Sequence, residues 1–416
     1  MTDSETPHTP EADGAPDSRD ASDSLDASGV QDADQTDRVV LRTAQETSGG
    51  PGCPCDVIVI DDATGALTAA SLDALAEHDG ARVLSWSASC SRARDLAAGF
   101  SEQLSTGRLV LPDGADPLPL DELASAADAH LALARLPKSL AGLEDRARRI
   151  AAAARSTGRE DLELIAGGRV KHMTRSQNEV LAQVFTEVSG SRGLGKSRAL
   201  IATGPHADAA PSEPSTSMVV VPVRGEPREL PLRGIGGVFG GASADAGSLL
   251  LLDALDRTLV SDELGLGEGR DRTAVDLGSG NGLLTAHLAL ALPAARIIAS
   301  DDDADAVHST RATIQALAPS DASRIQVTWD DALSQMPDRS ADLLVLNPPF
   351  HDGTAVDATL VHDLLDASAR VLVPGGQLWM VHNSHLRYRA EMERRVGPVT
   401  QRARDRRFTV LSARRV

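Results

Sequence analysis

The sequence predicts two consecutive doubly wound α/β domains that share one plan. In each half, short apolar runs typical of buried strands alternate with helical stretches, as in a mainly parallel sheet with helices on both faces. The order of these runs recurs roughly 215 positions later. The matching stretches are 56–72 with 273–290, 130–155 with 342–372, and 162–168 with 377–383.

This plan divides the chain into four parts. We expect a disordered acidic tail over residues 1–40, a first domain over 41–202, a linker and hairpin over 203–235, and a second domain over 236–416. Up to residue 38 the tail has 11 acidic residues against 2 basic ones and almost no large apolar side chain, so it cannot bury enough surface to fold. The linker is predicted from "TGPHADAAPSEPSTS" and the hairpin from "MVVVPVRGEPRELPL".

The composition limits the class of protein. Hydrophobic residues make up 41% of 416 positions, enough for two cores, but no apolar run is long enough to cross a bilayer. The N-terminus lacks the basic and then apolar order of a secretory signal. Cys53, Cys55 and Cys90 offer no second pair for a zinc site and fit reduced thiols. We therefore expect a cytoplasmic protein with no metal and no membrane partner.

Charge is unevenly distributed along the chain. The net charge is -19, yet the residues from 386 onward include ten arginines against three acids. A solvated helix face explains such a segment. A surface that binds the phosphates of a nucleic acid explains it equally well.

The second half carries a glycine loop that the first half lacks. In "DLGSGNG" (276–282), Asp276 ends a strand, and Gly278 and Gly280 let the backbone approach a ligand closely. Asp301 ends the next strand, where a carboxylate binds the two hydroxyls of a ribose. The first half has a single glycine and no acid at these places, so we expect the first domain to bind and the second to react. NAD and S-adenosylmethionine both fit this loop, because both contain an adenosine ribose.

The stretch "LVLNPPFHDG" (344–353) distinguishes these ligands. Asn347 follows the fourth strand, at the edge where open α/β sheets bind their ligands, and Pro348 and Pro349 stiffen the turn. The Asn347 side-chain oxygen and the Pro348 carbonyl supply two acceptors for one planar NH2 group, and Phe350 can stack on its base. Holding both N–H bonds frees the nitrogen lone pair toward an incoming methyl group. The stretch therefore predicts a clamp for methylating a planar amine.

With these motifs in this order, the chain resembles the bacterial ribosomal-RNA guanine-N2 methyltransferases, in which a degenerate methyltransferase domain precedes an active one. The resemblance covers about residues 56–416. It rests on "VIVIDDATGAL", "RLPKSLAGLE" and "ELIAGGRVKHMT" in the first half, and on "GVFGGASADAGSLLLLDAL", "DLGSGNG", "NPPFHDG", "HNSHLRY" and "RFTVLSARR" in the second.

The resemblance implies two tandem Rossmann-like, methyltransferase-type domains. It implies S-adenosylmethionine as cofactor and, as partner, ribosomal RNA that is either free or in a ribosomal subunit. The guanine would enter at Asn347, Pro348, Pro349 and Phe350, and the first domain and the Arg-rich segments would position the RNA. The implied cofactor-binding residues are Phe239, Asp245, Gly247, Asp276, Gly278, Gly280, Asp301, Asp302 and Asp331. Because "SDDD" presents three acids where one is usual, the ribose is assigned to either Asp301 or Asp302.

Other functions remain as alternatives. A nicotinamide-dependent oxidoreductase would need a hydride-transfer acid that is not evident, and a catalytically silent RNA-binding assembly factor would require the glycine loop to bind no cofactor. The same type of clamp also serves adenine N6 and protein glutamine. The motifs are divided between the large-subunit and small-subunit enzymes, so the subunit remains open.

Three further signals receive structural interpretations. "GSRGLGKS" (190–197) fits the phosphate-loop pattern, but such a loop lies between a strand and a helix. Here a helical stretch precedes it and a strand follows, so we do not expect an ATPase. His351 is expected to hold position near the clamp and not to act as a base. Trp329 and Trp379 lie on apolar strands and are expected in the core.

Overall fold

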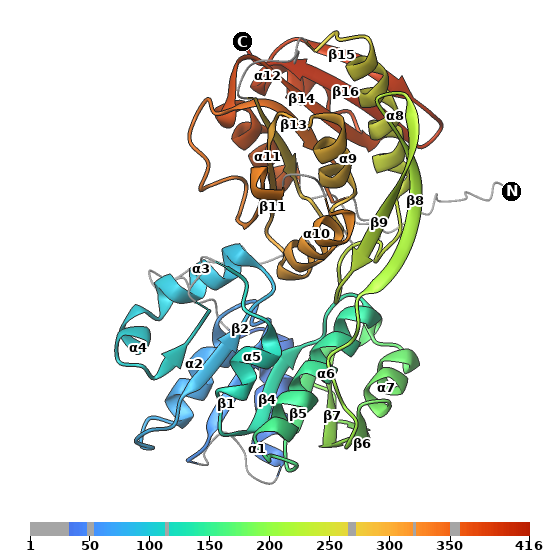
Figure 1. Cartoon of the computed structure of the whole chain (residues 1–416). Helices are drawn as coiled ribbons and strands as arrows, with labels where there is room; N and C mark the ends of the chain where they lie inside the picture. Colours follow the sequence, from blue (N-terminus) through green and yellow to red (C-terminus); the bar gives the residue numbers. More distant parts are fainter. Residues whose placement is uncertain (1–32, 48–53, 113–115, 265–271, 319–321, 350–357) are drawn as a thin grey trace, which may run out of the picture.

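The computed structural model describes residues 33–47, 54–112, 116–264, 272–318, 322–349 and 358–416. Two sheets of seven strands each and a separate two-stranded hairpin make up its β-structure. Figure 1 shows the N-terminal domain below, the C-terminal domain above and the hairpin along one flank. The predicted fold class, two tandem doubly wound domains, is confirmed.

The N-terminal sheet has the strand order β3-β2-β1-β4-β5-β7-β6. Its strands are β1 (Asp56–Ile60), β2 (Val83–Trp86), β3 (Leu109–Val110), β4 (Ala129–Arg135), β5 (Glu163–Arg169), β6 (Phe185–Gly190) and β7 (Ser197–Pro205). The helices are α1 (Gln35–Glu46), α2 (Ala66–Ala74), α3 (Cys90–Gly99), α4 (Ser101–Ser105), α5 (Leu120–Ser125), α6 (Leu140–Ser156) and α7 (Arg175–Ala182), with a short 3-10 helix at Val170–His172.

The C-terminal sheet repeats this order as β12-β11-β10-β13-β14-β16-β15. Its strands are β10 (Thr273–Leu277), β11 (Arg296–Asp301), β12 (Ile325–Trp329), β13 (Ala341–Leu346), β14 (Leu372–Asn383), β15 (Val399–Arg404) and β16 (Phe408–Arg414). The helices are α8 (Ala246–Val260), α9 (Leu283–Ala291), α10 (Ala304–Leu317), α11 (Ala358–Val371) and α12 (Arg389–Arg395), with a 3-10 helix at Ala322–Arg324.

Both sheets are parallel except at one end. In the C-terminal sheet β16 is antiparallel to β14 and to β15, and β7 has the same relation to β5 and β6 in the N-terminal sheet. The strand and helix pairs predicted from the repeat occupy equivalent places in the two domains. Since the carboxyl ends of parallel strands meet at one edge of the sheet, each domain has one edge suited to a ligand.

The predicted tail boundary at residue 40 is wrong for its last residues, because helix α1 begins at Gln35. Asp34 and Asp37 form a capping box at its N-terminus, and Val39 and Val40 are buried against the N-terminal sheet. Asp37 also accepts hydrogen bonds from Arg135 over 2.6 and 2.9 Å. Two acids that add to the charge of the tail therefore belong to the folded domain. The rest of the predicted tail, residues 1–32, lies outside the described residues.

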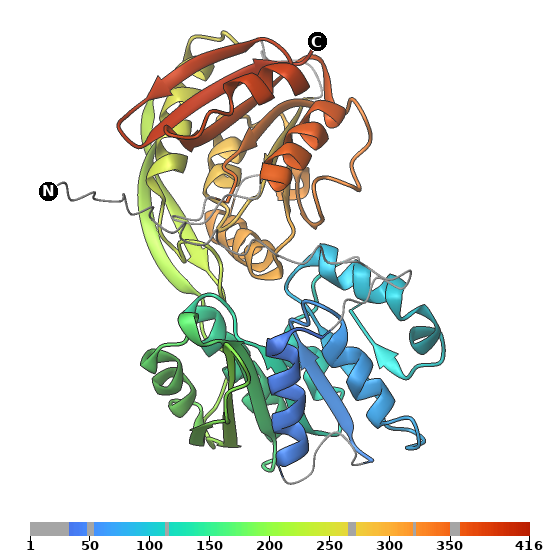
Figure 2. The same cartoon turned by 180° about the vertical axis from the view of Figure 1, so that it is seen from behind.

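The hairpin is confirmed, and the predicted linker is shorter than expected. Strands β8 (Ser215–Val223) and β9 (Glu226–Gly234) pair along their whole length, and residues 203–205 belong to β7. Figure 2 shows the hairpin from behind, where it follows the C-terminal domain. Its turn residues Arg224 and Gly225 both have positive φ, and the Asp256 carboxylate accepts from both of their amides.

The phosphate-loop pattern lies in a hairpin turn. β6 precedes it and β7 follows it, so the order of strand, loop and helix that a phosphate loop needs is not present in this segment. The helical stretch expected before the pattern is helix α7, which ends at Ala182, and the strand β6 begins at Phe185. The structure therefore supports the expectation that this segment is not an ATP site.

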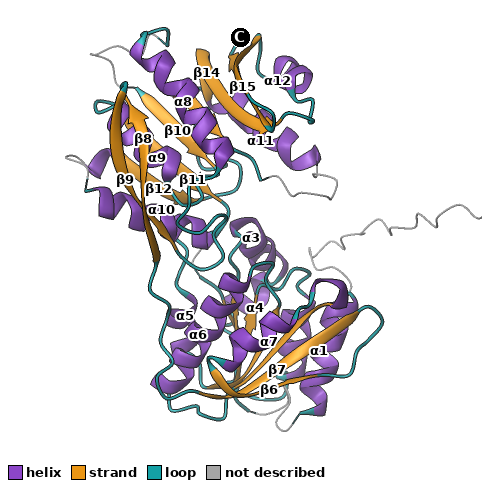
Figure 3. Ribbon diagram, turned by 90° about the vertical axis from the view of Figure 1, so that its right-hand side faces the viewer, coloured by secondary structure: helices purple, strands orange, loops and turns teal. Residues whose placement is uncertain are grey.

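The two domains meet through equivalent loops. Cys90 N donates to Asp302 O and Ala304 N donates to Ala88 O, each over 2.8 Å, so that the starts of α3 and α10 bond reciprocally. Figure 3 shows α3 on the side of the N-terminal domain that faces the other domain. Trp329 is 1% exposed and packs with the N-terminal core, while Trp379 is 0% exposed within the C-terminal core. Both predicted core positions are confirmed.

Among the described residues, no helix has the length and apolar character needed to cross a membrane. The same part of the chain contains no cluster of three or more His, Cys, Asp or Glu side chains able to hold a metal ion.

Candidate active site

The predicted site residues gather at the carboxyl edge of the C-terminal sheet. β10 lies between β11 and β13, and Leu277 is in register with Ser300 and with Leu346. The residues that follow on these strands, Gly278, Asp301 and Asn347, are therefore neighbours. The site is built at the point where three strands end together.

The glycine loop adopts a backbone that other residues rarely take. Gly278, Gly280 and Gly282 have φ values of 76°, 54° and 80°. A Cβ added to Gly280 would meet no atom within 4 Å, and one on Gly278 would meet only the Asn347 carbonyl oxygen, at 4.0 Å. Gly278 and Gly280 thus present bare backbone toward open space, as a closely approaching ligand requires.

Two acids flank this loop in the structure: Asp276 comes directly before it in the chain, and Asp301 bonds to it. Asp276 is fully buried, its Oδ2 accepts from the Thr285 hydroxyl, and its Oδ1 has no hydrogen-bond partner among the described residues. Burial raises the pKa of Asp276 to about 7. Asp301 accepts from Gly280 N over 2.9 Å and from Asp303 N over 3.0 Å, and burial raises its pKa to about 6.

The structure separates Asp301 from Asp302. The Asp302 carboxylate accepts from Ser91 N over 2.7 Å and from Ser89 Oγ over 2.8 Å, both at the start of α3 in the other domain. Asp302 therefore joins the domains, whereas Asp301 faces the glycine loop. A similar division holds after β12, where Asp330 is buried and accepts from Arg94 over 3.0 Å, while Asp331 is exposed.

Asn347 is held by the start of helix α8. Its side-chain nitrogen donates to Ser248 Oγ over 2.9 Å and lies 3.3 Å from both oxygens of Asp245. Asp245 caps α8 by accepting from the Gly247 and Ser248 amides. Because a carboxylate accepts only, the amide nitrogen must face it, and the Asn347 side-chain oxygen remains for another donor. Asp245, which is predicted to hold the cofactor, also contacts Asn347 of the clamp.

A segment before α8 extends over this edge of the sheet. Residues 235–244 connect β9 to α8 and carry Phe239, whose side chain is 73% exposed. The Asn281 amide ties the segment to the glycine loop by donating to Gly241 O over 2.9 Å and to Ser243 O over 2.8 Å. Gly247 lies close to Phe408, since an added Cβ would stand 3.4 Å from its ring.

The clamp is described only in part. Pro348 is buried and Pro349 is exposed, whereas Phe350 and His351 lie outside the described residues. Sequence reasoning missed Ser248, Asn281 and Thr285. The first was detectable from the spacing of a helix cap, since it lies three positions after Asp245. The contacts of the other two depend on how distant segments pack.

Two protein-family models match this chain, one in each half. The model of the methyltransferase small domain matches residues 229–412, and that of the RLMG N-terminal domain matches residues 21–207. Ribosomal RNA large subunit methyltransferase G of Streptomyces coelicolor is 33% identical over 282 residues, which cover 68% of this chain and 71% of the relative. The protein of the same name from Pseudomonas aeruginosa is 30% identical over 389 residues, covering 92% and 93%. The chain belongs to this methyltransferase family.

The family predicted from the order of the motifs is thereby confirmed. A solved structure with the same two-domain organisation is the T. thermophilus 16S rRNA N2-guanine methyltransferase in complex with AdoMet and guanosine. It has a TM-score of 0.66 and 25% identity, and the match covers 91% of this chain and 92% of that one. The methyltransferase small domain model covers the half of the chain that carries the glycine loop and the clamp, whereas the RLMG N-terminal domain model covers the half that has neither motif.

Proposed function

We propose that this chain transfers a methyl group from S-adenosylmethionine to the exocyclic N2 of a guanine in the ribosomal RNA of the large subunit. The observation that carries the proposal is the oriented amide of Asn347 beside the glycine loop. The names of the curated relatives support the large subunit and ribosomal RNA. The substrate would be RNA in the cytoplasm, either free or in a ribosomal subunit.

The residues present fit S-adenosylmethionine. The open backbone of Gly278 and Gly280 accommodates close approach, and the partnerless Oδ1 of Asp276 is an acceptor placed under the loop. We propose that Asp301 binds the ribose hydroxyls and that Asp331 lies beside the adenine. The carboxylates of Asp302 and Asp330 already accept hydrogen bonds from the N-terminal domain. Phe239 would cover the bound cofactor. When bound, the cofactor supplies an electrophilic methyl group on its sulfonium sulfur.

The clamp residues prepare the amine for transfer. The Asn347 side-chain oxygen and the Pro348 carbonyl would each accept one N–H of the guanine amino group, which turns the nitrogen lone pair toward the methyl group. Asp245 and Ser248 keep the Asn347 amide from rotating. The methylated nitrogen carries a positive charge and loses its proton readily to water, so no strong base is needed.

The N-terminal domain offers a surface for the RNA backbone, which we call the basic patch. It lies on and beside the 3-10 helix after β5 and the β6–β7 turn, which are joined by a 2.8 Å hydrogen bond from Val170 N to Lys196 O. Stretches 164–178 and 190–207 contain no acid, although the chain as a whole is strongly acidic. The exposed basic residues of the patch are Arg169, Lys171, Arg175, Arg192, Lys196 and Arg198.

The position of the basic patch suits a substrate that reaches the clamp. Arg169 ends β5 at the same edge of the N-terminal sheet as Asp61 after β1, and Asp61 lies at the domain contact. In the C-terminal domain, Arg404, Arg406 and Arg407 are exposed at the β15–β16 turn, beside the carboxyl end of β14. We propose that RNA phosphates contact both groups of cations, which would anchor the RNA on either side of the flipped guanine.

Product analysis tests the proposal. The full chain is incubated with labelled S-adenosylmethionine and, in separate reactions, with each naked ribosomal RNA, each ribosomal subunit and total protein. We expect N2-methylguanosine in digests of large-subunit RNA, whether it is free or assembled. N6-methyladenosine or a methylated protein glutamine would overturn the substrate, and absence of transfer to every substrate would favour an assembly factor.

A further inference from the structure

Residues 235–244, which carry Phe239 toward the proposed cofactor site, are held from both domains. Gly237 N donates to Asp305 Oδ2 over 2.7 Å, and Ile235 N donates to Ser309 Oγ over 2.9 Å. Asp305 and Ser309 both belong to α10, the helix that follows Asp301. One end of the segment is thus tied to the helix after the proposed ribose ligand.

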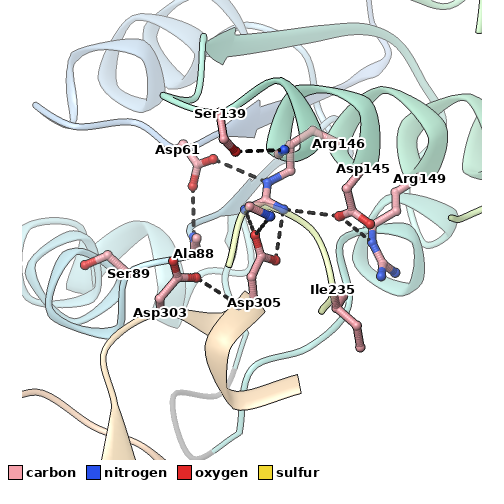
Figure 4. Close-up of polar contacts among 12 residues, drawn as sticks. Asp61, Ala88, Ser89, Ser139, Asp145, Arg146, Arg149, Ile235, Asp303 and Asp305 are labelled. Carbon is pink, nitrogen blue, oxygen red and sulfur yellow. Dashed lines mark hydrogen bonds and ion pairs between the residues drawn. The ribbon is translucent and has the colours of Figure 1, made fainter. Parts of the chain in front are cut away.

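Asp305 is in turn held by the N-terminal domain. Arg146 on α6 donates from Nη1 to Asp305 Oδ1 over 3.0 Å and from Nη2 to Asp305 Oδ2 over 2.9 Å. Figure 4 shows the Arg146 guanidinium reaching from α6 to Asp305 across the domain boundary. Both side chains are buried, so this two-bond ion pair is shielded from water and salt.

The surroundings of Arg146 allow it one orientation. Its guanidinium lies 4.5 Å from the centre of the Trp86 ring, and its nitrogens also lie 3.1 Å from Asp145 and 3.5 Å from Asp61. A planar fork is required to stack on an indole and bind a carboxylate with two bonds at once. A lysine at this position would keep the charge and lose the geometry.

The segment also fits closely between the domains. A Cβ on Gly236 would stand 2.5 Å from the Asp305 carboxyl carbon, and one on Gly237 would stand 3.0 Å from Ser139 Oγ and 3.4 Å from Gly142 Cα. Ser139 and Gly142 lie at the start of α6. The two glycines therefore pass through a narrow space bounded by α6 on one side and α10 on the other.

We propose that Arg146 is a positioning residue for the cofactor site. Through Asp305 it fixes the Gly237 end of residues 235–244, so that the docked N-terminal domain holds Phe239 over the cofactor. The inference rests on the proposed function, because it requires the cofactor to lie beneath this segment. It gives the degenerate domain a task in cofactor binding that is separate from RNA placement.

The test compares two lysine variants of neighbouring arginines in the full-length protein. Arg146→Lys removes the two-bond contact to Asp305. Arg148→Lys is the matched control, because Arg148 lies on the same helix and pairs with Glu144, which no contact joins to Arg146 among the described residues. We expect Arg146→Lys to weaken S-adenosylmethionine binding about tenfold by calorimetry, a usual size of coupling between sites, and Arg148→Lys to leave it unchanged.

Hydrogen exchange supplies a readout that loss of stability alone would not give. In Arg146→Lys, amides of residues 235–244 should exchange faster while the N-terminal strands keep their protection, and saturating cofactor should restore the slow exchange. Asp305→Asn keeps one acceptor for Gly237 N and loses the ion pair with Arg146. It should therefore also weaken cofactor binding and speed exchange in residues 235–244. This variant decides the question if Arg146→Lys does not fold.

If Arg146→Lys and Asp305→Asn both leave the cofactor affinity and the hydrogen exchange of residues 235–244 unchanged, the inference is overturned. A wild-type protein that binds no S-adenosylmethionine would instead contradict the proposed function. The two failures are therefore distinguishable.

Discussion

Asn347 donates its side-chain amide to Ser248 Oγ over 2.9 Å, although the two residues are 99 positions apart in the chain. The contact joins the end of β13 to the first turn of α8. It turns the side-chain oxygen of Asn347 away from α8, where it can accept from a substrate amine. The orientation of the clamp therefore depends on a helix that precedes the whole C-terminal sheet.

Removing either partner of this contact should slow methyl transfer. Asn347→Ala removes one of two acceptors, and we expect kcat to fall about 10²-fold with little change in cofactor affinity. Ser248→Ala leaves the Asn347 side-chain oxygen in place but lets the side chain rotate, and we expect kcat to fall about tenfold. Thr258→Ala is the control, because Thr258 lies on the same helix and its hydroxyl bonds only to Ala254 O among the described residues. Equal rates for Ser248→Ala and the wild type would refute the orienting role.

Asp301 should govern cofactor affinity. Asp301→Ala removes the proposed ribose ligand and the acceptor for Gly280 N, so binding of S-adenosylmethionine and of its demethylated product should both weaken in calorimetry. Asp342→Ala provides the comparison, since Asp342 begins β13 at the opposite edge and bonds to Thr273 N. Tight binding of NAD by the wild type, or unchanged affinity in Asp301→Ala, would contradict the assignment.

Stability of the cofactor-free protein should fall with rising pH. Burial raises the pKa of Asp276 to about 7 from its usual 3.8, so the folded state holds this proton more tightly than the unfolded chain does. Ionisation therefore favours unfolding. The stability from this group should be lost between about pH 4 and pH 7, by about 1 kcal/mol for each pH unit, and should change little above about pH 8. Burial also lowers the pKa of His308 and His382. These two groups make stability rise with pH, but only below about pH 6.5, where the unfolded chain binds their protons more tightly.

Denaturant titrations at several pH values measure this slope. Asp276→Asn should reduce it, because the amide does not titrate, and the part that remains belongs to Asp301 and Asp303, whose pKa values burial also raises, to about 6 and about 7. The same slope in the variant and the wild type would show that another group is responsible.

The basic patch should carry part of the RNA affinity. Lys171→Glu combined with Lys196→Glu should weaken RNA binding and reduce the slope of log K against log salt by about one for each phosphate that the protein no longer neutralises. Methyl transfer at saturating RNA should change little, because the clamp is intact. Arg228→Glu combined with Arg257→Glu makes the same change in net charge on the hairpin and on helix α8 of the C-terminal domain. An equal loss of affinity in both pairs would indicate a general effect of charge and would contradict a specific surface.

Much of the fold and the chemistry can be read from local patterns. Strands and helices alternate visibly because buried parallel strands are continuous apolar runs, and the duplication shows because both halves keep these runs in one order. The glycine loop and the Asn-Pro-Pro-Phe stretch stand directly after strands, where the chain needs positive φ values and a stiff turn. The predicted tail extends too far because counted charges do not reveal that Asp34 and Asp37 cap a helix.

The roles of individual acids are set by packing. Asp301 and Asp302 are adjacent in sequence, yet one supports the glycine loop and the other bonds to the start of a helix in the N-terminal domain, because successive side chains at a strand end point in opposite directions. Asp245 reaches Asn347 across 102 positions, and Arg146 reaches Asp305 across 159. No local pattern encodes such pairs, since they exist only once the two sheets, the hairpin and the domain contact have brought distant helix starts together.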